Sequence, residues 1–306
     1  MSHTTPVNGD FVNHPWRGIH VATALPFRDD LGVDFDAYAA HVAWLAANGM
    51  DGVTPNGSLG EYQTLTAEER ALVVRTAVEA APDGFRVMPG VAAYGSGEAV
   101  RWVEQAAEAG AQSVLLLPPN AYRADRATVV AHYREAAKVG VPVVAYNNPY
   151  DTKVDLTADL LAELHGEGLI VAVKEFSGDV RRAYEIREAA PELDLLIGTD
   201  DVLLELALAG AVGWIAGYPN ALPAACGELY RLAVAKDLDA ALPLYRDLHS
   251  LLRWDSKTEF VQAIKLSMDL AGRPGGPCRP PRLPLTPDQA ARITTDTEAA
   301  LAKGYR

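Results

Sequence analysis

Eight short apolar runs alternate along the chain with longer segments of mixed character. The runs are rich in Val, Ile and Leu with little alternation of polar and apolar residues, which is typical of strands buried on both faces of a sheet. They cover residues 18–24, 52–55, 85–91, 112–118, 141–147, 169–174, 193–198 and 211–217. We therefore predict a sheet of parallel strands.

The segments between the runs have the apolar spacing of helices. Residues 34–47 show it clearly, and Thr66 with Glu69 predicts a capping box at the start of the next helix. The other predicted helices here are residues 96–109, 125–138, 157–165 and 179–189. Glycines stand where helix C-caps are expected, at Gly110, Gly140 and Gly210.

Strand–helix units in this succession predict an α/β fold, a (β/α)8 TIM barrel. The alternative is an open doubly wound sheet, which would need a Gly-rich phosphate loop after the first strand. Leu25-Pro26-Phe27 stands there instead, and the chain has no GxGxxG or Walker pattern. The barrel is predicted to span residues 16–235 and to hold the active site.

Residues 236–306 are predicted to form a C-terminal helical extension. No strand-like run follows the eighth, and helix-period segments at 237–252, 257–270 and 286–302 take its place. A stretch rich in Pro and Gly, residues 273–284, separates the last two.

Composition and charge narrow the class of protein. Of the 306 residues, 49% are hydrophobic and 22% are charged, which argues against bulk disorder. The formal net charge of −13 argues against nucleic acid and anionic membranes as main partners. Cys226 and Cys278 are too few for a disulfide framework. Because the N-terminus is polar and lacks a signal-peptide pattern, a cytoplasmic protein is expected.

Polar residues at the carboxyl ends of the strands are the candidates for chemistry, because barrel active sites lie there. Lys174 is the only lysine inside an apolar strand-like run. Burial disfavours the ammonium form, and a lysine that is partly neutral is a nucleophile for carbonyl carbons. The alternative is a structural lysine that pairs with Glu175 or Asp201.

Tyr146 lies on the neighbouring predicted strand, at the same level as Lys174. A phenol beside an imine-forming lysine can relay protons. The alternative for Tyr146 is an ordinary residue of the barrel core.

The loop after the second strand is a candidate anion site. Gly57 and Gly60 flank Ser58 and Leu59, so backbone N–H groups can approach an anion closely. The Ser58 hydroxyl is a further donor. The carboxylate of a 2-oxo acid would fit, although a tight turn into the next helix would also explain this loop.

Together these residues resemble the dihydrodipicolinate synthase / N-acetylneuraminate lyase family of class I, Schiff-base aldolases. Three motifs carry the resemblance, in the order and at the spacing of the family. They are the G-x-x-G-E loop at residues 57–61, the Y-N-x-P motif at 146–149 and the K-x-x-x-G-D motif at 174–179. The likeness runs through nearly the whole chain.

The resemblance implies a Schiff-base-forming lyase. Lys174 would form an imine with C2 of a 2-oxo acid such as pyruvate, and Tyr146 would relay protons. Ser58, with the backbone N–H groups of Ser58 and Leu59, would hold the substrate carboxylate. Neither a metal nor an organic cofactor is implied, because the protonated imine is itself the electron sink. Members of the family are usually homotetramers, and the implied partner is a small-molecule 2-oxo acid.

Three departures from the family pattern argue against a true synthase, and the Y-N-N-P motif with the K-E-x-S-G-D-x-R-R stretch at residues 174–182 is similar to catabolic members. The synthases carry an arginine two residues after the Y-N-x-P proline, where this chain has Asp151, whose charge would repel a second carboxylate. Leu59 replaces a second hydroxyl residue of the loop. The tyrosine that synthases receive from a neighbouring subunit would fall near Asn120, and Tyr122 is the closest replacement.

Similar catabolic enzymes include dehydratases of deoxy sugar acids, hydroxy-oxo-acid aldolases and a deaminase of hydroxyproline breakdown. Gly217, after the eighth strand, is expected to line the substrate site. The polar residues expected around the distal end of the substrate are Tyr150, Asp151, Thr152 and Asp201. Their polarity favours a neutral, hydroxyl-bearing tail.

Three other functions remain open at this point. The first is dihydrodipicolinate synthase proper. The second is a non-catalytic 2-oxo-acid-binding barrel, which would be expected to lose Lys174 or Tyr146. The third is a metal-dependent aldolase or hydrolase, but of the ligands it needs only Asp200 and Asp201 stand near a strand end, and the histidines are scattered.

Overall fold

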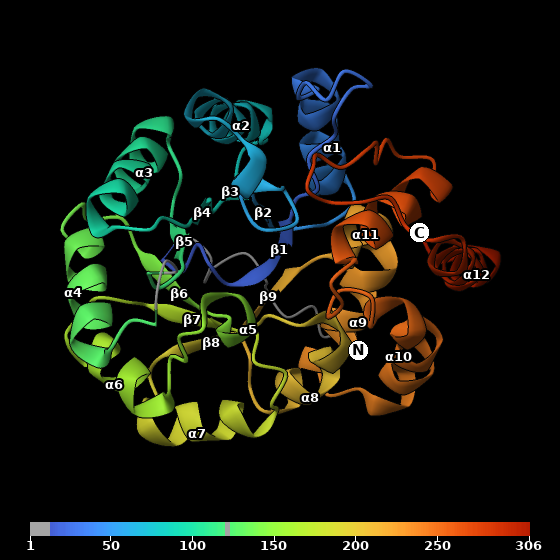
Figure 1. Cartoon of the computed structure of the whole chain (residues 1–306). Coiled ribbons are helices and arrows are strands. Elements are labelled where there is room, and N and C mark those ends of the chain that lie inside the picture. The colour runs from blue at the N-terminus through green and yellow to red at the C-terminus, as the bar shows by residue number, and fades with distance from the viewer. Residues whose placement is uncertain (1–12, 120–122) are drawn as a thin grey trace.

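Short parallel strands form one sheet at the centre of the protein (Figure 1). The computed structural model describes residues 13–119 and 123–306. In these residues the strands are β1 (Gly18–Ala22), β2 (Gly52–Thr54), β3 (Arg86–Val87), β4 (Gly90–Val91), β5 (Val114–Leu116), β6 (Val143–Asn147), β7 (Ala172–Glu175), β8 (Asp194–Ile197) and β9 (Gly213–Ala216). Every predicted run overlaps at least one strand.

The sheet curls round on itself. Its order is β3-β2-β1-β9-β8-β7-β6-β5-β4, and the two end strands belong to one segment interrupted only by Met88 and Pro89. On one side of this segment the Gly90 N–H donates to the Pro55 carbonyl (2.8 Å). On the other side the Pro89 carbonyl accepts from the Leu115 N–H (2.9 Å). The α/β fold therefore resembles the predicted (β/α)8 barrel, with its third strand split where Pro89 lacks an N–H.

Helices surround the sheet, as Figure 1 shows. They are α1 (Phe35–Ala47), α2 (Ala67–Ala80), α3 (Ser96–Ala109), α4 (Arg126–Ala137), α6 (Ala158–Gly166), α7 (Arg181–Ala189), α8 (Leu203–Leu208) and α9 (Pro223–Val234). Short helical turns at the strand ends are η1 (Tyr62–Thr64), α5 (Pro149–Thr152), η2 (Asp200–Val202) and η3 (Tyr218–Asn220). The predicted capping box is confirmed, because Thr66 accepts from the Glu69 N–H and Glu69 accepts from the Thr66 N–H.

The interior of the ring is filled by side chains and is not a pore. Along β6 the even-numbered residues Val144 and Tyr146 join an inner cluster, while Val143 and Ala145 pack against the helices outside. Period-two alternation therefore gives Lys174 on β7 the same inward direction as Ala172. The inner cluster comprises Trp16, Met88, Ala92, Leu115, Leu117, Val144, Tyr146, Ala172, Leu196 and Ile215.

The C-terminal extension consists of the three predicted helices, α10 (Leu238–Leu252), α11 (Phe260–Leu270) and α12 (Pro287–Ala302). Helix α10 packs on α9, and α12 packs on both α10 and α11, on one side of the ring (Figure 1). The predicted division between residues 235 and 236 falls in the turn between α9 and α10.

A buried ion pair joins this extension to the barrel. The Lys265 Nζ on α11 lies 2.9 Å from Glu61 Oε1 in the loop after β2, and the two side chains are 2% and 0% exposed. Lys265 also donates to the Pro277 carbonyl (2.7 Å), and Glu61 accepts from the Arg279 N–H (3.0 Å). Both charges are thus paired and hydrogen-bonded, as buried charges must be.

We expect Lys265→Met to lower the free energy of unfolding by about 3 kcal/mol, because it leaves the Glu61 charge buried without its partner. Lys138→Met, at an exposed lysine on α4, is the matched control and should change the stability by less than about 0.5 kcal/mol. Urea denaturation followed by circular dichroism measures both. Equal stabilities for the two variants would show that the pair does not hold the extension in place.

Candidate active site

Lys174 and Tyr146 lie side by side inside the ring. They are register partners on β7 and β6, and the Lys174 Nζ is 4.3 Å from the centre of the Tyr146 ring. The two residues are 6% and 8% exposed. The prediction that they stand at the same level on adjacent strands is therefore confirmed.

The Lys174 amine has no ion-pair partner among the described residues. The Glu175 carboxylate points elsewhere, since it accepts from Asn147 Nδ2 (2.9 Å) and the Ser177 N–H (2.6 Å). The Asp201 carboxylate accepts from Ser256 Oγ (2.8 Å). The alternative of a structural lysine paired with Glu175 or Asp201 is therefore wrong.

Burial lowers the pKa of Lys174 to about 8, although the charges of Asp255 and Asp200 favour the ammonium and act in the opposite direction. An amine with this pKa is neutral in an appreciable fraction of molecules near neutral pH. A neutral amine has the free lone pair that attack on a carbonyl carbon requires.

The Tyr146 phenol is buried and stays protonated. Burial raises its pKa, and the charges of Asp255 and Asp151 raise it further. Asn148 Nδ2 lies 3.4 Å from its hydroxyl. Because the phenol keeps its proton at neutral pH, Tyr146 can donate to an oxygen that forms beside Lys174.

The loop after β2 lies on the same rim of the barrel. Ser58 is half-buried, whereas the Leu59 side chain packs in the core, which explains an apolar residue at this position. Gly60 packs closely against the first strand segment, because a Cβ there would lie 3.1 Å from the Thr23 carbonyl oxygen. Tyr62, which follows the loop in η1, raises the pKa of Tyr146, although sequence reasoning did not single it out.

The structure places three of the residues predicted around the distal end of the substrate in different surroundings. Asp151 accepts from Asn148 Nδ2 (2.9 Å), and its charge raises the pKa of Tyr146, so it lies near the Tyr146 phenol. The Thr152 side chain is buried and its hydroxyl donates to the Asn148 carbonyl (2.8 Å), so the prediction for Thr152 is wrong. Tyr150 is exposed and donates to the Ser177 carbonyl.

Two buried carboxylates stand beside Gly217 at the ends of β8 and β9. Asp200 accepts from Trp214 Nε1 (3.0 Å), from the Gly217 N–H (3.1 Å) and from the Tyr218 N–H (2.9 Å). Asp255, between α10 and α11, accepts from the Asp200 N–H (3.3 Å). Sequence reasoning missed Asp255, because it lies outside the barrel segment and belongs to no motif.

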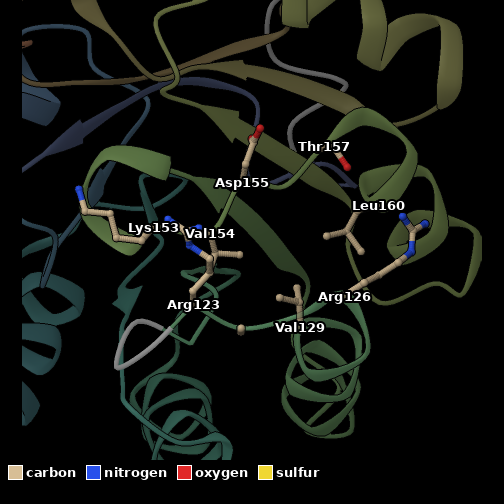
Figure 2. Close-up of a pocket in the computed structure, with 9 residues that line it drawn as sticks. Arg123, Arg126, Val129, Lys153, Val154, Asp155, Thr157 and Leu160 are labelled. Atoms are coloured by element: carbon tan, nitrogen blue, oxygen red, sulfur yellow. The ribbon is translucent and has the colours of Figure 1, made fainter.

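A separate cavity of about 350 Å³ lies outside the ring (Figure 2). Arg126 and Val129 reach it from α4 and Leu160 from α6, while Arg123 and Asp155 come from the adjoining loops. None of the predicted site residues lines this cavity. Tyr122 and Asn120, named above as candidates for a hydroxyl relay, lie outside the described residues.

Among residues 13–119 and 123–306, no group of three or more His, Cys, Asp or Glu side chains could hold a metal ion. No helix in the same residues is long and apolar enough to cross a membrane.

Comparison with known proteins identifies the family. The profile of the Dihydrodipicolinate synthetase family matches residues 15–300. The chain belongs to this family. The resemblance inferred from the three motifs is thereby confirmed, and the protein is a Schiff-base-forming lyase of the class I aldolase type.

Relatives of the family cover almost the whole chain. The 4-hydroxy-tetrahydrodipicolinate synthase of Methanosphaerula palustris is 31% identical over 283 residues, which are 91% of this chain and 97% of the relative. An uncharacterized DapA-like lyase of Rhizobium meliloti is 32% identical over 273 residues, 88% and 91% of the two chains. The crystal structure of YagE from E. coli K12 in complex with pyruvate has a TM-score of 0.85 at 27% identity and covers 91% and 96%.

We expect imine formation by this lyase to accelerate about tenfold per pH unit below the pKa of Lys174, about 8, and to level off above it. The reason is that only the neutral amine attacks a carbonyl carbon, and its fraction rises with pH up to the pKa. Mixing with pyruvate, quenching into borohydride after fixed times and weighing the intact protein measures the rate. A rate still rising steeply between pH 9 and 10 would contradict the lowered pKa.

Proposed function

We propose that this protein is a catabolic lyase that acts on a 2-oxo acid through an imine between Lys174 and C2 of the substrate. One observation carries the proposal. Lys174 is buried beside Tyr146 without an ion-pair partner among the described residues, and burial lowers its pKa to about 8. An amine in this setting is suited to attack a carbonyl.

The proposed chemistry begins with the neutral Lys174 amine. Its nitrogen forms a bond to C2 of the 2-oxo acid. The former carbonyl oxygen takes one proton from that nitrogen and one from the Tyr146 phenol and leaves as water, which gives the protonated imine. The protonated imine then withdraws electrons, so that a proton or a carbon fragment is lost from C3. A group expelled from the next carbon, or hydrolysis of the imine, completes the reaction.

The loop after β2 is proposed to bind the substrate carboxylate. Within the described residues no backbone acceptor takes the N–H of Ser58 or Leu59, so both remain for an anion. The Ser58 hydroxyl adds a third donor. Gly57 at the start of this loop leaves space for close approach, with the nearest atom to a Cβ there 3.8 Å away.

The substrate tail is proposed to be neutral and hydroxyl-bearing. Asp151 lies near the Tyr146 phenol, whose pKa its charge raises, and a second carboxylate would meet repulsion there. Asp201 and Gly217 remain proposed as residues near the tail and the reacting centre. This substrate class includes those of dehydratases, aldolases and deaminases that act on hydroxylated 2-oxo acids.

A second candidate is 4-hydroxy-tetrahydrodipicolinate synthase, which is favoured by the names of relatives such as the M. palustris enzyme. The acidic residue at position 151 opposes it. A non-catalytic 2-oxo-acid-binding barrel is a third candidate, opposed by the presence of both Lys174 and Tyr146.

We further propose a cytoplasmic homotetramer, in keeping with the family. Light scattering of the purified protein tests the assembly.

Borohydride trapping with pyruvate tests the imine. We expect a covalent adduct on the peptide that holds Lys174, and we expect Lys174→Ala to form no adduct and to keep less than about 1% of turnover. Lys153→Ala, at an exposed lysine on the rim after α5, is the matched control and should be trapped as the wild type is. An adduct on Lys174→Ala would put the nucleophile elsewhere.

A comparison of 2-oxo acids with different tails tests the proposal that the substrate tail is neutral. We expect kcat/KM for hydroxyl-bearing, neutral tails to exceed that for dicarboxylates by about tenfold or more, because Asp151 repels the second carboxylate. Asp151→Asn should narrow this difference, because it should raise kcat/KM for the dicarboxylate. A clear dicarboxylate preference in the wild type would favour the synthase.

A further inference from the structure

Asp255 belongs to the C-terminal extension, yet its side chain lies beside Asp200 and Gly217 at the carboxyl ends of β8 and β9. Both of its chain neighbours are anchored. Trp254 Nε1 donates to Asp296 on α12 (3.1 Å), and Ser256 Oγ donates to Asp201 after β8 (2.8 Å). The first contact fixes the turn between α10 and α11 to α12, the second holds it against the end of β8, and Asp255 is only 8% exposed.

The absence of a side chain at Gly217 makes room for the Asp255 carboxylate. A Cβ at position 217 would lie 2.6 Å from Asp255 Oδ1, closer than two such atoms can approach. Any other residue at the end of β9 would therefore displace the carboxylate. Gly217 and Asp255 are far apart in the sequence but pack directly against each other in the fold.

The Asp200 and Asp255 carboxylates differ in their hydrogen-bond partners. Asp200 accepts from Trp214, Gly217 and Tyr218, so both of its oxygens hold the turn after β9. The one hydrogen-bond donor to Asp255 among the described residues is the Asp200 N–H, which binds Oδ2. Oδ1 of Asp255 therefore keeps its capacity to take up a proton.

Asp255 also acts on both reactive groups. Its charge raises the pKa of Lys174 and the pKa of Tyr146, so the carboxylate is close enough to both groups to act on them electrostatically. Burial raises the pKa of Asp255 itself to about 6, against the lowering effect of Lys174. A carboxylate with this pKa is ionised near neutral pH and is a stronger base than an exposed one.

We propose that Asp255 is the general base that removes the C3 proton of the substrate imine on Lys174, an inference that rests on the proposed function. The C3–H bond breaks and its proton passes to Asp255. The electron pair forms the C2–C3 double bond, and the imine π pair moves onto the Lys174 nitrogen to give a neutral enamine. Asp255 then holds the proton for return to C3 or for a leaving group. Tyr146 handles the oxygen at C2, so the two acid–base steps fall to two residues.

Asp255→Asn separates this step from imine formation. Pyruvate is the probe, and exchange of its methyl protons with D2O, followed by proton NMR, reports C3 deprotonation. We expect the variant to be trapped by borohydride as fully as the wild type at pH 8, because loss of the Asp255 charge lowers the pKa of Lys174 and so does not reduce the neutral amine. We expect its exchange rate to fall by about 100-fold or more.

Asp239→Asn is the matched control, at an exposed aspartate on α10 of the same extension, and should preserve both trapping and exchange. Circular dichroism checks the folding of each variant. If Asp255→Asn does not fold, the second test uses Asp255→Ala with added formate, which supplies a carboxylate in place of the missing side chain. Recovery of exchange as formate rises supports a base at this position, whereas no recovery in a folded Asp255→Ala protein contradicts it.

The outcomes distinguish this proposal from the one on which it rests. No pyruvate adduct on the wild type would remove the imine mechanism, and the base with it. A trapped Asp255→Asn variant with unchanged exchange would overturn the role of Asp255 alone. A trapped wild type that does not exchange the methyl protons would overturn it equally.

Discussion

Desolvation of the Lys174 ammonium is the physical effect on which the site depends. The alternation of side chains along β7 turns Lys174 into the ring, beside the apolar side chains of the inner cluster. Because the described residues offer it no ion pair, burial lowers its pKa, and the charges of Asp200 and Asp255 oppose the shift only in part. The same burial keeps the neighbouring phenol of Tyr146 protonated. One environment thus favours a neutral nucleophile and a neutral acid at once.

The C-terminal extension completes the carboxyl end of the barrel at two points. Lys265 on α11 pairs with Glu61 in the loop after β2, and both charges are buried. Asp255, at the turn before α11, meets the ends of β8 and β9 beside Gly217. The loop proposed to bind the substrate carboxylate and the proposed base are therefore both tied to this one extension. A change in its packing would reach both sides of the site.

Local patterns in the sequence were sufficient for the elements and for the central pair of residues. Apolar runs and helical spacing depend on neighbours within one or two turns, which is why the strands, the capping box at Thr66 and the extension helices were predicted. The equal level of Tyr146 and Lys174 followed because parallel neighbours in a barrel have regular offsets. Helices α8 and α9 were not among the predicted segments, although the buried Cys226, Leu229, Tyr230 and Ala233 of α9 lie at helical spacing.

The sequence by itself determined the order of strands and helices, the family motifs and the choice of Lys174 as the nucleophile to test. Only the tertiary structure decided which charges act on that lysine. Glu175 is adjacent in the chain but bonds to Asn147, whereas Asp255 reaches the end of β8 from 55 positions away. Lys265, one lysine of an amphipathic helix by its pattern, meets a carboxylate 204 positions away. Such contacts depend on how distant segments pack, and short-range periodicity carries no information about that packing.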